Sequence, residues 1–173
     1  MNAVSFFYQA GASFLIFGLL SRWYVWPFIQ RLDRKAALTV LLLPSLLRHV
    51  GETHLARTAI PDPVSGPLAW GISIGDFACL ASALLAIVCL RSYPRIAIPM
   101  VWISSAIGLV DYVGIAAWSA GEHAYDHLGA HWYVGCYYVP LLGVLQVLVL
   151  MTLLKRDWPG DARQPRRTAG AAA

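Results

Sequence analysis

The chain has 173 residues, of which 58% are hydrophobic and only 13% are charged, with a formal net charge of +4 and a mean hydropathy of +0.60. A soluble domain carries about 25% charged residues. This composition therefore excludes an ordinary soluble domain and predicts an integral membrane protein. The basic residues are spread over the ends of apolar runs, which argues against a nucleic-acid partner.

Five apolar segments have about the length that a helix needs to cross a bilayer. They cover residues 4–26, 36–56, 70–90, 96–118 and 133–154. We therefore expect an all-α integral membrane protein, with residues 1–156 forming a single bundle of about five transmembrane helices. Residues 157–173 are rich in Pro, Gly, Arg and Ala and predict a disordered basic tail.

The first segment has no basic residue before it and continues into Trp23, Tyr24 and Trp26, as the interfacial end of a span does. We expect it to be retained rather than cleaved as a signal peptide. The second segment contains Pro44, which removes a backbone donor and predicts a kink. As an alternative, this segment is a short helix that ends near Leu47.

The second segment also contains Arg48, His49 and Glu52 behind an uninterrupted apolar run. Ionisable groups inside a membrane are costly, so such a cluster marks a candidate functional site. The third segment carries Asp76 and the fourth carries Asp111, each roughly 10 Å below the same boundary of the bilayer at the rise of a helix. Three segments are therefore expected to bring ionisable groups to one layer.

Small residues recur at every fourth position of the third segment, and such a stripe lets another helix approach closely. The stripe consists of Gly71, Gly75, Cys79 and Ala83. It predicts a helix contact, with contact between copies of the chain as one option. The three cysteines have no zinc-like spacing, and a disulfide between Cys79 and Cys136 stays open.

The connection after the fourth segment holds His123, His127 and His131, spaced i, i+4 and i+8. On a helix these rings would share a face suited to a transition metal. Gly121 and Gly129 argue against a continuous helix. We therefore rank a solvated loop first, a metal site second and haem ligation lower, and no cofactor is favoured.

Lysine and arginine gather in the first connection, the third connection and the tail, while the other two connections are acidic and rich in histidine. Because positive residues favour the cytoplasmic side, the pattern predicts an outside N-terminus and a cytoplasmic C-terminus in a plasma (inner) membrane. The ionisable cluster then lies in the outward half of the bundle.

Arg48 does not lose its proton, so it needs acceptors, and Asp76 and Asp111 are the expected partners. One arginine cannot neutralise these two aspartates and Glu52 together. At least one carboxyl must then keep a proton, pair with a histidine or face water, and a proton held in this way suits a general acid.

We accordingly expect a small membrane-embedded enzyme that performs acid–base chemistry, such as isomerisation, cyclisation or hydrolysis, on a lipophilic molecule. Its catalytic candidates are Asp111, Asp76, Glu52, His49 and Arg48. Its expected aromatic pocket walls are Trp70, Tyr112, Trp118 and Trp132. The alternatives are a proton- or solute-coupled transport subunit and an accessory or assembly protein in which the ion pairs are only structural.

Overall fold

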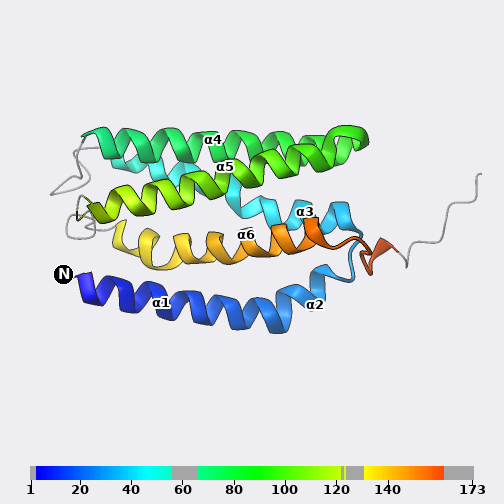
Figure 1. Ribbon diagram of the computed structural model, residues 1–173, viewed down its shortest axis with the longest axis horizontal. Coiled ribbons are helices and arrows are strands. Elements are labelled where there is room, and N and C mark those ends of the chain that lie inside the picture. The colour runs from blue at the N-terminus through cyan, green and yellow to red at the C-terminus, as the bar shows by residue number, and fades with distance from the viewer. Residues whose placement is uncertain (1–2, 56–65, 122, 124–130, 162–173) are drawn as a thin grey trace, which may run out of the picture.

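The structure is a computed structural model that describes residues 3–55, 66–121, 123 and 131–161, with residues 3 and 51–55 described by their backbone alone. This part of the chain is helical and contains no strand (Figure 1). The α-helices are α1 (Ala3–Leu20), α2 (Trp26–Ile29), α3 (Arg34–Leu42), α4 (Gly66–Ser92), α5 (Pro94–Gly121) and α6 (Val139–Leu154). The other helical turns are the π-helices η1 (Ser21–Val25) and η5 (Val134–Tyr138) and the 3-10 helix η2 (Leu43–Leu55).

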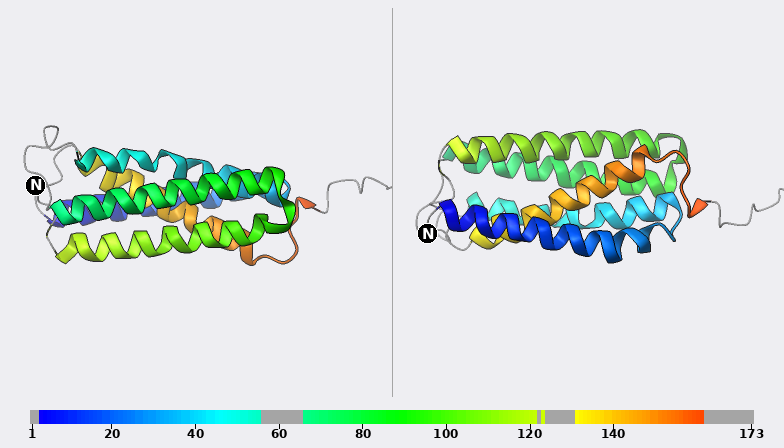
Figure 2. Two further views of the ribbon diagram at one scale, coloured as in Figure 1. Left: turned by 90° about the horizontal axis from the view of Figure 1, so that it is seen from above. Right: turned by 60° about the horizontal axis from the view of Figure 1, so that its bottom comes forward.

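Four helices are long and apolar enough to cross a membrane, as the composition predicted. They cover Val4–Ile29, Gly66–Ser92, Pro94–Gly121 and Val134–Leu154. They lie side by side along the long axis of the molecule (Figures 1 and 2). Many of their large apolar side chains are exposed, which suits helices that contact lipid rather than water.

The predicted second span, residues 36–56, is not a continuous α-helix. The helix α3 ends at Leu42, and the 13-residue 3-10 helix η2 follows. Pro44 explains the change, because its ring cannot donate a hydrogen bond and clashes with the preceding turn of an α-helix. A 3-10 helix rises about 2.0 Å per residue, so α3 and η2 together reach about 40 Å, as far as the longer α4 does. The five predicted spans are thus four apolar α-helices and one broken segment.

The main hydrophobic core lies at one end of the bundle, where α2 and α3 meet the later helices. Ile29, Leu38 and Leu41 are fully buried there against Val101 of α5 and Val149 of α6. The helix α1 packs on α6 and η5, whereas η2 packs on α4. The end of the molecule that holds the N-terminus has less of this dense packing, and the cavity described below lies there.

The first residues of the predicted disordered tail pack against the bundle. Trp158 is only 3% exposed, and its Nε1 donates a hydrogen bond to the carbonyl of Leu32 over 2.8 Å. The Asp161 carboxylate accepts a hydrogen bond from the backbone N–H of Arg34 over 3.0 Å. The prediction of disorder from Asp157 is therefore wrong as far as Asp161, because an apolar indole finds a buried place beside the first connection. Residues 162–173 lie outside the described part.

Candidate functional site

Arg48 joins two carboxylates from different helices. Its Nη1 donates to Oδ1 of Asp76 on α4 over 3.0 Å and to Oδ2 of Asp111 on α5 over 2.6 Å. The three side chains are 9%, 18% and 11% exposed respectively. The prediction that separate segments bring these groups together, with the aspartates as partners of Arg48, is confirmed.

Two glycines of α4 allow α5 to approach this closely. A Cβ on Gly75 would overlap Oδ1 of Asp111, and a Cβ on Gly71 would lie 2.6 Å from the ring of Trp118. The rest of the small-residue stripe, Cys79 and Ala83, is buried as well. The stripe therefore packs inside its own chain at its two glycines. The alternative of a contact between copies remains a prediction that no observation tests.

The cluster has more negative than positive charge among the described residues. One guanidinium serves two carboxylates through a single nitrogen, and Nε of Arg48 is buried with no hydrogen-bond partner in the described part. The thiol of Cys79 lies close enough to interact electrostatically with all three groups. The cluster therefore gathers a guanidinium, two carboxylates and a thiol at one place in the bundle.

A cavity of about 330 Å³ lies beside the cluster, with Arg48, Asp76 and Asp111 in its wall. Most of the other lining is apolar or aromatic and comes from α1, α5, η5 and α6. The aromatic lining residues are Phe6, Phe7, Phe14, Tyr112 and Tyr138. This combination of an apolar wall with a few convergent polar groups is typical of small-molecule sites, and the volume lies at the small end of their range.

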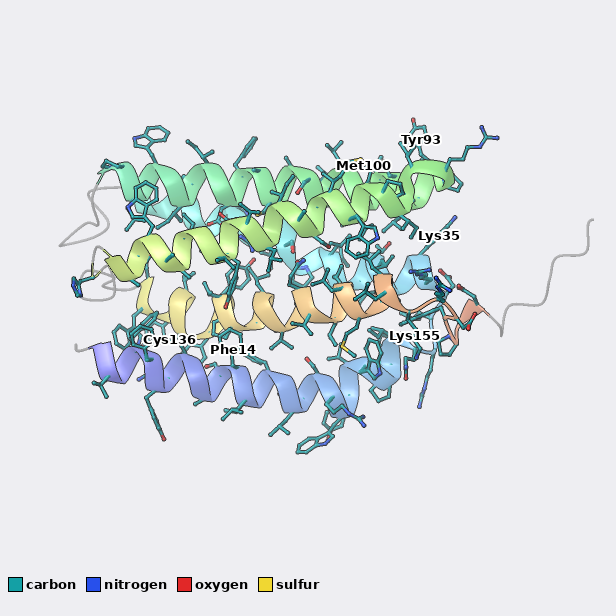
Figure 3. All side chains as sticks on the ribbon, viewed as in Figure 1. Phe14, Lys35, Tyr93, Met100, Cys136 and Lys155 are labelled. Atoms are coloured by element: carbon teal, nitrogen blue, oxygen red, sulfur yellow. The ribbon has the colours of Figure 1, made fainter. Side chains whose placement is uncertain are left out.

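Part of the cavity's lining on α1 and α5 is exposed. Phe7 and Phe14 on α1 are 57% and 38% exposed, and Ala116 and Ala120 on α5 are also exposed, although all four line the cavity. Figure 3 shows Phe14 pointing from α1 toward α6.

A glycine of α6 lies beside two side chains that line the cavity. A Cβ on Gly143 would lie 2.9 Å from the ring of Phe14 and 3.1 Å from the hydroxyl of Tyr112. Both side chains, one from α1 and one from α5, therefore lie close to Gly143, where a larger residue would not fit.

The π-helix η5 shapes the wall on the α6 side. Its end is marked by the N–H of Val139, which bonds to the carbonyl of Val134 five residues earlier. Pro140 follows directly and has no N–H to continue the α-helical pattern, so the wider turn accommodates it. Tyr138 lies in this turn, and its hydroxyl donates to the carbonyl of Pro44 over 2.8 Å, which fixes the ring against η2.

Of the five predicted catalytic residues, His49 lies outside the cluster and Glu52 cannot be assigned to it. His49 is exposed, and its Nδ1 lies 3.3 Å from the carbonyl of Leu46. The tight turn of the 3-10 helix directs neighbouring residues about 120° apart, so Arg48 points inward while His49 does not. The side chain of Glu52 lies outside the described part.

Only one of the four predicted aromatic wall residues lines the cavity, namely Tyr112. Trp118 covers Gly71, and Trp70 is 58% exposed. Trp132 is buried and donates through Nε1 to Oε1 of Gln9 over 2.7 Å, so it fastens α1 to the start of the last span. These three tryptophans do not line this cavity, because a similar depth in the membrane does not fix which side of a helix faces it.

The histidine series is not a continuous helical face. The helix α5 ends at Gly121, and His123 has a positive φ of 51°. His131 lines the cavity, whereas His127 lies outside the described residues. Within the described ranges no group of three or more potential ligands could hold a metal ion. Cys79 and Cys136 are both free, so the disulfide left open by the sequence does not form.

The aromatic wall contributed by α1 was missed in the sequence. Phe6, Phe7, Ala10 and Phe14 follow one another at helical spacing and all line the cavity. This spacing is visible in the sequence, but it lies within a run that is apolar on every side. Tyr138 was missed for the same reason.

Residues 5–154 match the model of a protein family described as Domain of unknown function (DUF8737), and the chain belongs to this family. No curated protein and no solved structure matches the chain. The matched range includes the cluster and every described residue that lines the cavity.

Proposed function

We propose that the protein is a membrane-embedded enzyme that performs acid–base chemistry on a lipophilic small molecule. The observation that carries the proposal is the pair of aspartates bound to one guanidinium nitrogen in the wall of an otherwise apolar cavity. A structural ion pair needs only one carboxylate for each arginine. The second carboxylate and the adjoining empty volume together favour chemistry.

The two carboxyls suit a general acid and a general base. Arg48 holds both in fixed positions, and the proposed reaction begins with a proton on one of them. The protonated carboxyl would give its proton to one atom of the substrate while the other carboxylate takes a proton from a second atom. General acid–base catalysis of this kind contributes about 10²–10⁴-fold to a rate.

Isomerisation is the reaction class that this arrangement favours among the three expected ones. It consumes no water and no co-reactant, and it returns the pair of aspartates to one protonated and one ionised carboxyl. Cyclisation by proton transfer meets the same condition, whereas hydrolysis requires water in a cavity whose wall is mainly apolar.

The proposal includes a topology with an outside N-terminus, a cytoplasmic C-terminus and the cavity in the outward half. Basic side chains at the opposite end of the bundle support it, and Figure 3 places Lys35 and Lys155 there. A reporter enzyme fused after Leu154 is expected to be active only if it is a cytoplasmic type. Activity of a periplasmic type of reporter at that position would overturn the topology.

The substitution Asp111→Asn tests the function. The amide keeps the shape of the side chain and an acceptor for Arg48, but it cannot exchange a proton. We expect wild-type protein purified in detergent to carry a lipophilic molecule that mass spectrometry identifies, and the Asp111→Asn protein to lose it or to carry a different form. The control is Asp161→Asn, at the far end of the molecule, which should carry the wild-type molecule.

Identical molecules in all three proteins would contradict the assigned role of Asp111. A protein that carries nothing, with Asp111→Asn merely less stable, would instead support an accessory protein with a structural ion-pair network. The metal content of the same samples tests the histidine series independently.

Proton- or solute-coupled transport is the second candidate, because buried polar side chains continue beyond the cluster. The hydroxyls of Ser82 and Ser104 lie 3.3 Å apart, and Nε2 of Gln146 donates to the carbonyl of Ser105 over 3.1 Å. Proton flux into liposomes that contain the protein, lost in Asp111→Asn, would favour this function over the enzyme.

A further inference from the structure

We infer that the hydroxyl of Tyr112 donates a hydrogen bond to a carbonyl oxygen of the molecule bound in the cavity, so that the ligand is a compact lipophilic ketone. The inference rests on the proposed function, because it assumes that the cavity binds a lipophile. It adds a further catalytic residue and the chemical class of the substrate.

The position of the hydroxyl is the first observation. Tyr112 follows Asp111 on α5, and both residues line the cavity. The Tyr112 hydroxyl would lie 3.1 Å from a Cβ at Gly143, and it interacts electrostatically with Arg48. A ligand in the cavity would therefore have both the carboxyls of the cluster and this hydroxyl in the wall around it.

The second observation is that this hydroxyl has a hydrogen to donate. The hydroxyl of Tyr138, the other tyrosine in the wall, already donates to the carbonyl of Pro44. Within the described ranges the hydroxyl of Tyr112 makes no hydrogen bond. A tyrosine hydroxyl removed from water usually has a partner. An oxygen of the ligand would supply that partner in a wall that is otherwise mainly apolar.

The proposed isomerisation requires a carbonyl group for a chemical reason. A carboxylate is a weak base, and it removes a proton from carbon only where a neighbouring carbonyl accepts the charge that develops. Moving an isolated double bond would instead require protonation to a carbocation, for which a carboxyl is too weak an acid. A hydrogen-bond donor aimed at the carbonyl oxygen stabilises the developing charge.

A ketone whose C=C bond is one carbon removed from the carbonyl fits this chemistry. The carboxylate takes the proton from the carbon between the two groups, and the electron pair of that C–H bond forms a C=C bond conjugated with the carbonyl. The electron pair of the original C=C bond takes the proton of the other carboxyl at its far carbon. One C–H bond breaks and one forms, so nothing is oxidised or reduced.

The test compares two probes of nearly equal shape, adamantanone and methyleneadamantane, which differ in having C=O or C=CH₂. Their binding to the full chain in phosphatidylcholine nanodiscs is measured against empty nanodiscs, and each affinity is expressed relative to the probe concentration in the bilayer. We expect the ketone to bind about two- to tenfold more tightly, as one hydrogen bond allows. Tyr112→Phe should remove this preference, whereas Tyr137→Phe, outside the lining, should keep it.

Infrared spectroscopy reads the hydrogen bond directly. The difference between spectra with ordinary and isotope-labelled adamantanone isolates the carbonyl band of the probe. This band should lie at a lower frequency in the wild-type protein than in Tyr112→Phe. If Tyr112→Phe does not fold, fluorotyrosine in place of Tyr112 is used, because its more acidic hydroxyl should lower the frequency further.

The outcomes separate the inference from the proposed function. Equal binding of the two probes, or a carbonyl band that does not respond to the change at Tyr112, overturns the inference and leaves a cavity for lipophiles intact. A molecule without a carbonyl group, purified with the wild-type protein, would overturn it as well. If neither probe binds, the inference and the lipophile site of the proposed function both fall.

Discussion

Replacing Arg48 by leucine is expected to lower the free energy of unfolding by about 3–5 kcal/mol, the usual cost of removing one partner from a buried ion pair. The reason is specific to this site. Arg48 contacts two largely buried carboxylates, at 2.6 and 3.0 Å, and it links η2 to α4 and α5. Without it, Asp76 and Asp111 lose the guanidinium that both of them contact, and two like charges stay close together.

Unfolding curves in a mild detergent, followed by circular dichroism, measure this loss. Adding Asp76→Asn and Asp111→Asn to Arg48→Leu should recover a large part of the stability, because the unpaired charges are then gone. Arg48→Lys should be milder than Arg48→Leu, since both carboxylates contact a single nitrogen. If Arg48→Leu is as stable as the wild type, the ion pairs do not hold the bundle together in solution.

Replacing Gly75 by alanine is expected to destabilise the protein by about 1–3 kcal/mol, the usual cost of overpacking. The added Cβ would overlap the carboxylate of Asp111, which has little room to move because Arg48 holds its other oxygen. The helices α4 and α5 must then separate, or Asp111 must leave Arg48. Either change should also lower the amount of the lipophilic molecule that is purified with the protein.

The matched control is Gly114→Ala on α5, where a Cβ would meet nothing within 4 Å. Alanine is the better helix former, so this substitution should leave stability unchanged or raise it by up to about 1 kcal/mol. Both proteins are compared by their unfolding midpoints and by the amount of lipophilic molecule that is purified with them. A Gly75→Ala protein with wild-type stability and binding would show that α4 and α5 do not pack as closely as the structure has them.

The charged residues of the candidate site were predictable from the sequence. Arg48, Asp76 and Asp111 each lie in an apolar segment at a similar depth, and ionisable groups have few inexpensive places in a membrane. Their convergence follows from that cost alone. The same reasoning did not place His49, because adjacent residues of a helix point about 100–120° apart and only one of the two can face the cluster. Pro44 marked the break in that segment but not the form of the turns after it.

The apolar half of the site was decided by the tertiary structure. Phe6 and Phe14 line the cavity, while Trp70 and Trp118 do not, although all four lie in apolar helices. In water, hydrophobic periodicity tells which face of a helix is buried. In a membrane both lipid and protein accept apolar side chains, so the pattern does not distinguish them.

By itself the sequence determined the membrane class, the main helices and the pairing of the buried charges, because hydropathy and the cost of buried charge act residue by residue. Only the tertiary structure decided that Gly75 admits Asp111, that Trp158 docks beside Leu32, and that α1 completes the cavity. These features depend on which surfaces of distant segments meet. Two surfaces pack closely only when their shapes are complementary. Shape complementarity is a property of a pair of elements, so it cannot be inferred from either stretch of sequence alone.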